Sequence, residues 1–117
     1  MRRFALTFVA LLALVGCVPV LSPVLDRQGD AITVTVTANQ PAYSVTLSVL
    51  DAATDDERCG PIGPDFGCVL GDIGEGQNVV VNGIATGEAS CVAFGFSNPS
   101  LNIGSYRPYP CSVGGSS

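Results

Sequence analysis

The chain has 117 residues with ten carboxylates, five arginines and neither histidine nor lysine, so its formal net charge at pH 7 is −5. This length suits one compact domain. Nucleic acid is not an expected partner, because recognition of its backbone depends on clustered Lys and Arg. Catalysis through a histidine or a Ser/Lys dyad is excluded by the same composition.

The first sixteen residues have the pattern of an export signal. Met1, Arg2 and Arg3 carry the initial positive charge, and an apolar run at residues 4–15 follows. The run is too short to span a bilayer, which needs about 20 apolar residues. An ordinary signal peptide would end in an A-x-A-like cleavage site, and none follows the run. We therefore predict a signal peptide for export over residues 1–16.

The apolar run ends in the tetrapeptide Leu14-Val15-Gly16-Cys17, which resembles the lipobox of bacterial lipoproteins. The resemblance implies a covalent lipid on Cys17, with a thioether-linked diacylglycerol and usually an amide-linked third acyl chain such as palmitate. Two lipid signals already anchor a protein stably to a membrane. By resemblance to the sorting rule of some diderm bacteria, Val18 in place of Asp favours the outer membrane. The expected location is extracytoplasmic and membrane-anchored.

The cysteines support the same cleavage point. There are five, and assigning Cys17 to the lipid leaves an even number that should be oxidised outside the cytoplasm. Of the three pairings that four cysteines allow, we expect Cys59 with Cys68, closing a Gly/Pro-rich loop, and Cys91 with Cys111, tying the C-terminal tail to a strand. Free buried thiols are the alternative. A zinc site is not expected, since the chain has no histidine and no C-x-x-C pair.

Residues 17–29 are expected to form the lipidated cysteine and an extended tether, with the domain at 30–117. The tether is unusually apolar, with aliphatic side chains at Val18, Val20, Leu21, Val24 and Leu25. Two interpretations stay open. The segment is the domain's own first edge strand with its prolines on the solvent side, or it docks against another envelope protein or the lipid interface, in which case these five side chains bind the partner.

From residue 31 the hydrophobic period becomes two. Residues 31–38 and 44–49 alternate apolar and Thr/Ser positions around a turn at 39–41, which predicts an antiparallel pair of strands. A loop follows at 52–67. Further strands are expected at 68–71, 77–86 and 89–97, with an extended tail after them.

The strand predicted at 89–97 is the most aromatic of the chain. Val92, Phe94 and Phe96 share one face, and Cys91 lies on the other. Aromatic residues that alternate along a sandwich strand usually face the core, so we expect Phe94 and Phe96 inside. Short strands at near-regular spacing predict an all-β sandwich of about five to seven strands with two disulfides.

The run CVLGDIGEGQNVVV at residues 68–81 resembles the Cys-x-Leu-Gly-x-Leu-x-x-Gly-x-x-x-x-Val segment of Ig-like repeats on bacterial surface proteins, including the cell-adhesion-related domains. This resemblance implies an Ig-like antiparallel β-sandwich. The chain has one copy where those proteins have tandem arrays. An adhesion role is therefore only an analogy, because fold does not imply function.

Residues with metal-binding or catalytic chemistry are few. The candidates for a calcium site are Asp55, Asp56, Glu57 and Asp65, but their spacing is not that of an EF-hand, and most of the 6 to 8 oxygen ligands would have to come from the backbone or water. A pair of carboxylates can serve a glycosidase, but such an enzyme also needs an aromatic sugar cleft, and the chain has no tryptophan. We expect neither an enzyme nor a cofactor other than the lipid.

These features predict a non-catalytic, structural or accessory lipoprotein of the bacterial cell envelope. It would act through protein–protein interaction, docking onto a larger assembly such as a secretion channel, pilus machinery or a surface layer. The alternative is an extracytoplasmic binding module for a soluble ligand, a glycan or Ca²⁺.

Overall fold

The computed structural model describes residues 19–97 and 107–114, and this part of the chain is folded as strands and turns without helix. Its strands are β1 (Leu21–Gln28), β2 (Ala31–Ala38), β3 (Ala42–Ala53), β4 (Cys59–Ile62), β5 (Asp65–Ile73), β6 (Asn78–Phe96), β7 (Arg107–Pro110) and β8 (Ser112–Val113). The all-β sandwich predicted from the sequence is confirmed. The described residues form eight strands, more than the five to seven expected.

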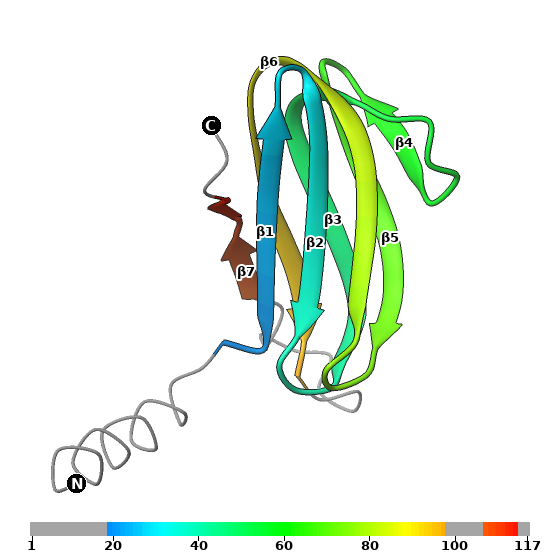
Figure 1. Ribbon diagram of the computed structural model, residues 1–117. Helices are drawn as coiled ribbons and strands as arrows, with labels where there is room; N and C mark the ends of the chain where they lie inside the picture. Colours follow the sequence, from blue (N-terminus) through cyan, green and yellow to red (C-terminus); the bar gives the residue numbers. More distant parts are fainter. Residues whose placement is uncertain (1–18, 98–106, 115–117) are drawn as a thin grey trace, which may run out of the picture.

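The strands form two layers that are joined through β6 (Figure 1). The first half of β6 pairs with β2 and its second half with β3, so β6 belongs to both layers. One layer has the order β6, β2, β1, β8, and the other has β4, β5, β3, β6, β7. All pairs are antiparallel except β1 with β8. The sequence predicted β6 as two separate strands, but it is one strand that bends.

The bend in β6 depends on a glycine. A Cβ on Gly83 would stand 2.8 Å from a backbone oxygen of β3, so only glycine lets the two backbones approach this closely. Beyond this point the register with β3 jumps, with Ala52 opposite Ala85 but Leu50 opposite Ser90. The extra residues of β6 carry the chain from one layer to the other.

Two bulges interrupt β3, at Ser44 and Asp51, where φ is 54° in both cases. This left-handed conformation costs a residue with a side chain about 1 to 2 kcal/mol. The neighbouring strand β5 compensates at both positions. The Oδ1 of Asp72 accepts a hydrogen bond from the N–H of Ser44 at 3.0 Å, and the Oδ1 of Asp65 accepts one from the N–H of Asp51 at 2.8 Å.

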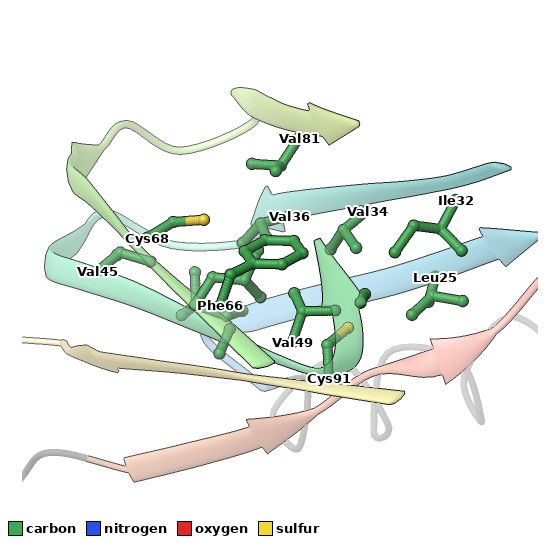
Figure 2. Packing of buried hydrophobic residues seen from close by; sticks show 14 of the residues in the cluster. Leu25, Ile32, Val34, Val36, Val45, Val49, Phe66, Cys68, Val81 and Cys91 are labelled. Carbon is green, nitrogen blue, oxygen red and sulfur yellow. The ribbon is translucent and has the colours of Figure 1, made fainter. Parts of the chain in front are cut away.

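The core lies between the two layers and contains only apolar side chains among the described residues (Figure 2). The alternation predicted for β2 and β3 is confirmed, because their aliphatic positions point inward on both strands. Phe66 of β5 is the largest fully buried side chain. Full burial of a Val, Leu, Ile or Phe side chain stabilises the fold by about 1.5 to 3 kcal/mol each. The core is built from Leu21, Leu25, Ile32, Val34, Val36, Val45, Leu47, Val49, Phe66, Ile73, Val81 and several smaller residues.

Both disulfides form with the pairing expected from the sequence. Cys59 is bonded to Cys68 between the adjacent strands β4 and β5, and Cys91 of β6 is bonded to Cys111, which lies between β7 and β8. Because β7 pairs with β6 and β8 pairs with β1, the C-terminal tail crosses from one layer to the other. The second disulfide therefore holds one side of the sandwich closed.

Candidate functional site

The N-terminal end of the sandwich is the end at which β1 begins. There Asn39, in the turn after β2, holds the chain before β1 in place. Its side-chain Nδ2 donates to the carbonyl oxygen of Pro19 at 2.9 Å, and its backbone N–H donates to that of Val20 at 2.8 Å. The chain is therefore fixed to the domain from Pro19 onward. The proposed lipid site at Cys17 lies outside the described residues, and so does Val18.

The segment expected as a tether is a strand of the domain. Leu21 and Leu25 are 1% and 2% exposed and lie in the core, so the expectation that these two side chains bind a partner is wrong. Val20 and Val24 are half-buried. The strand pairs with β2 along its length and with β8 on its other side. The segment is therefore a strand of the domain's own sandwich, as the other interpretation had it. That interpretation also placed the prolines on the solvent side, but Pro23 is buried.

The domain therefore begins earlier in the chain than the sequence predicts. We expected the domain to begin at residue 30, but that position lies in the tight turn between β1 and β2. Gly29 in this turn has a φ of 60°, which suits glycine. Because alternate side chains of β1 pack against the core, the folded unit includes the eight residues of that strand.

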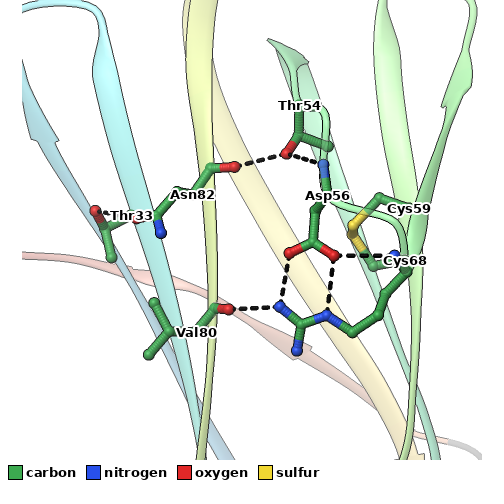
Figure 3. Close-up of polar contacts among 8 residues, drawn as sticks. Thr33, Thr54, Asp56, Cys59, Cys68, Val80 and Asn82 are labelled. Atoms are coloured by element: carbon green, nitrogen blue, oxygen red, sulfur yellow. Dashed lines mark hydrogen bonds and ion pairs between the residues drawn. A yellow bond between two sulfur atoms is a disulfide. The ribbon is translucent and has the colours of Figure 1, made fainter.

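The loop after β3 closes the other side of the sandwich (Figure 3). Arg58 makes a two-pronged ion pair with Asp56, with Nη2 to Oδ2 at 2.6 Å and Nε to Oδ1 at 2.9 Å, and donates from Nη2 to the carbonyl oxygen of Val80 at 2.7 Å. The hydroxyl of Thr54 donates to the carbonyl oxygen of Asn82 at 2.6 Å. These bonds occupy backbone acceptors along the first half of β6, on the edge opposite β2, which would otherwise be an open sheet edge.

The ion pair also shifts the pKa values of both its members. The hydrogen bonds from Arg58 lower the pKa of Asp56 from 3.8 to about 2, and Asp56 raises the pKa of Arg58 in turn. Asp56 is therefore ionised at any pH above about 3. Its two carboxylate oxygens face the guanidinium and are not available for a metal.

The four calcium candidates are not brought together. Asp56 binds Arg58, and Asp65 accepts the hydrogen bond from Asp51 that supports a bulge in β3. Within residues 19–97 and 107–114, no three carboxylate or cysteine side chains are placed to hold a metal ion. The sequence predicts one loop that contains Asp55, Asp56, Glu57 and Asp65, but Asp65 is the first residue of strand β5 and its carboxylate binds the backbone of β3.

The strand with the aromatic residues faces the opposite way from the prediction. Cys91, Ala93 and Gly95 point into the core, whereas Phe94 and Phe96 are half-buried on the outer face. The reason is the lack of space: a Cβ on Gly95 would lie 3.1 Å from the Cδ1 of Leu21 across the sandwich. Only small residues fit on the inner face here, so the rings face outward.

These rings gather at the N-terminal end of the domain. Tyr43 of β3, also half-buried, lies opposite Phe96, and Pro108 of β7 lies opposite Phe94. Arg107 is the next residue and pairs with Gly95. We call Tyr43, Phe94, Phe96, Arg107 and Pro108 the aromatic patch.

Charge is distributed unevenly between the two ends. The end opposite the N-terminal end carries the turn between β1 and β2, the bend of β6 and the ends of β3. Six carboxylates lie at or near it: Asp26, Asp30, Asp51, Asp55, Asp65 and Glu88. At the N-terminal end the described carboxylates are Asp72, near the end of β5, and Glu75, in the turn after it, and Arg107 is a cation at this end.

Comparison with known proteins shows a likeness of fold alone. No family model and no curated protein matches the sequence. Two solved structures match, both of the GH20 exo β-N-acetylglucosaminidase from Vibrio harveyi, one in complex with N-acetylglucosamine (TM-score 0.52, 9% identity) and one an inactive mutant (TM-score 0.53, 10% identity). In both matches the aligned part spans 82% of this chain but only 18% of the enzyme chain. No helix within the described parts of the chain is long and apolar enough to cross a membrane.

Proposed function

We propose that the chain is a non-catalytic lipoprotein of the bacterial cell envelope, anchored through acyl chains on Cys17 and serving as an accessory subunit of a larger envelope assembly. The observation that carries this proposal is the use of the cysteines. Two disulfides take four of the five cysteines, and the remaining one stands directly after Gly16 in the lipobox. Disulfides of this kind persist in oxidising compartments outside the cytoplasm, and a diderm source would place the protein at the outer membrane.

The architecture suits a small scaffold. Each side of the sandwich is closed, one by the tail with Cys111 and the other by the loop with Arg58. The strands at the sheet edges, β4, β7 and β8, are only four, four and two residues long, which limits unspecific pairing. With Leu21 and Leu25 of β1 used in the core, the surface offered to a protein partner is the acidic end, which points away from the anchor.

The anchor is tested by fractionating cells that express the full chain and measuring the intact mass of the product. The wild type is expected in the membrane fraction with two or three acyl chains, and Cys17→Ser in an unprocessed or mislocalised form. Cys111→Ser is the matched control, because it removes a different cysteine and should remain lipidated. A soluble wild type without acyl mass would contradict the proposal.

The accessory role is tested by purifying the lipidated protein from membranes in a mild detergent. We expect a defined envelope protein to co-purify in constant ratio, and to be lost when Asp30 and Glu88 are changed to lysine. Tyr43→Ala, at the opposite end, should keep the partner. A protein that elutes alone from its native membrane, even after chemical cross-linking, would reject the role.

A further inference from the structure

We propose that the aromatic patch is a membrane contact: its rings lie in the headgroup region of the bilayer that holds the anchor, so the domain stands with its N-terminal end in the interface rather than floating on a tether. The inference rests on the proposed lipidation of Cys17. The steps that lead to it are the reach of the chain, the position of the rings and the distribution of charge.

The first step is the reach from the lipid to the fold. Hydrogen bonds from Asn39 hold Pro19 and Val20 against the domain. Cys17 precedes Pro19 by two residues, and an extended chain spans at most about 3.6 Å per residue, so the lipidated residue stays within about 7 Å of the fold. The twelve-residue tether predicted from the sequence does not exist as free chain. The N-terminal end of the sandwich therefore meets the membrane surface directly.

The second step is the height of the rings. The Cδ1 of Leu21 lies 3.1 Å from the Cβ position of Gly95, so this residue of β6 is level with the start of β1. Phe96 and its partner Tyr43 lie one residue further toward the N-terminal end, level with Val20. Phe94 is two residues away along β6, or about 7 Å. The rings thus span the depth of about 5 to 10 Å to which interfacial apolar groups enter a bilayer.

The third step is the chemistry of the patch. Tyrosine and other aromatic rings favour the interface between headgroups and acyl chains. Arg107, beside them on β7, suits the phosphates of the headgroups, since a long cationic side chain can keep its charge at the surface while its stem lies lower. Most carboxylates lie at the opposite end, where an anionic membrane would not repel them.

The test uses the full lipidated chain in phosphatidylethanolamine and phosphatidylglycerol vesicles. The chain has no tryptophan, so Phe96→Trp introduces a single fluorescent reporter in the patch. Leu50→Trp is the matched control, because Leu50 is exposed on the same face of the sheet but six residues away along β6, or about 20 Å. Bromine atoms on the acyl chains quench a tryptophan only when they come close to it.

We expect brominated lipid to reduce the fluorescence of F96W to about half or less, as for an interfacial ring, and to leave that of L50W nearly unchanged. Tyr43→Trp provides a second reporter should F96W melt well below the wild type.

Anchored protein with no quenching of either patch reporter, or with equal quenching in L50W, would overturn the membrane contact and leave the lipoprotein proposal intact. Quenching relieved by adding a soluble glycan or a purified envelope protein would also overturn it, because the face would then belong to that ligand. An intact mass without acyl chains would overturn both proposals.

Discussion

Asp65, the first residue of β5, accepts a hydrogen bond from the backbone N–H of Asp51 at 2.8 Å, at a bulge where Asp51 has a φ of 54°. At the other bulge of β3, Asp72 does the same for Ser44. Asp65, a calcium candidate in the sequence, and Asp72 are thus structural supports, because a left-handed residue in a strand leaves its N–H turned away from the sheet ladder. This use of Asp65 also explains its absence from any metal site.

The first prediction concerns this support. Asp65→Ala should lower the free energy of unfolding by about 0.5 to 1.5 kcal/mol, the typical contribution of one hydrogen bond. Asp55→Ala, an exposed acid of the preceding loop, should change it by less than about 0.5 kcal/mol. Urea denaturation of the two variants measures the difference. Equal effects would mean that the bulge does not depend on the carboxylate.

The second prediction tests whether β1 belongs to the domain. Leu25→Ala should destabilise the fold by about 2 to 5 kcal/mol, because it empties a filled core position. Val24→Ala, on the outward face of the same strand, should cost about 1 kcal/mol or less. If both variants unfold at the same denaturant concentration as the wild type, β1 would be a tether after all.

The third prediction concerns the bend of β6. Gly83→Ala should destabilise the domain by about 1 to 3 kcal/mol, since the added methyl meets a backbone oxygen that cannot rotate away. Gly60→Ala is the matched control, because nothing lies within 4 Å of its Cβ position, and it should be neutral within about 0.5 kcal/mol. Thermal melts followed by circular dichroism compare them. A neutral G83A would show that the two strands can separate at the bend.

The fourth prediction separates the two disulfides. Replacing either pair by alanine should cost about 3 kcal/mol, with the longer loop of Cys91 and Cys111 contributing about 0.7 kcal/mol more. Their local effects should differ. Loss of Cys91 and Cys111 frees the tail from β1, so hydrogen exchange of the β1 amides should accelerate, whereas loss of Cys59 and Cys68 should leave it unchanged. Faster exchange in both variants would contradict the closure of one side by the tail.

The fifth prediction follows from the pKa of Asp56. Because the folded state lowers this pKa from 3.8 to about 2, the ion pair with Arg58 stabilises fully above about pH 4 and is lost as the pH falls toward 2. The gap in melting temperature between the wild type and Asp56→Asn should therefore shrink over this range. Asp55→Asn, from the same loop, serves as the control. A gap that stays constant from pH 5 to pH 2 would rule out this ion pair as its source.

Local patterns in the sequence were enough for much of the fold. The alternation in residues 31–38 and 44–49 predicted β2 and the central part of β3, because a strand with one face in the core needs apolar residues at every second position. The odd number of cysteines, together with their positions in a loop and a tail, predicted both disulfides. The strand β4 was missed, since its sequence of cysteine, glycine, proline and isoleucine has no alternation to detect.

Other features depended on contacts between residues far apart in the chain. A period of two separates the faces of β6 but does not say which face is inside, and the packing of Leu21 against Gly95 places Phe94 and Phe96 outside. The same packing turns the expected tether into β1.

The sequence by itself therefore determined the strand pattern, the number of disulfides and the lipobox that suggests an anchor, because each is encoded by neighbouring residues or by composition. Only the tertiary structure decided that the fold holds the chain from Pro19 onward, two residues after the proposed anchor, that the aromatic rings lie at that end, and that Asp56 and Asp65 bind Arg58 and the backbone rather than a metal. These depend on which segments meet across the sandwich, and that is settled by the packing of the whole core.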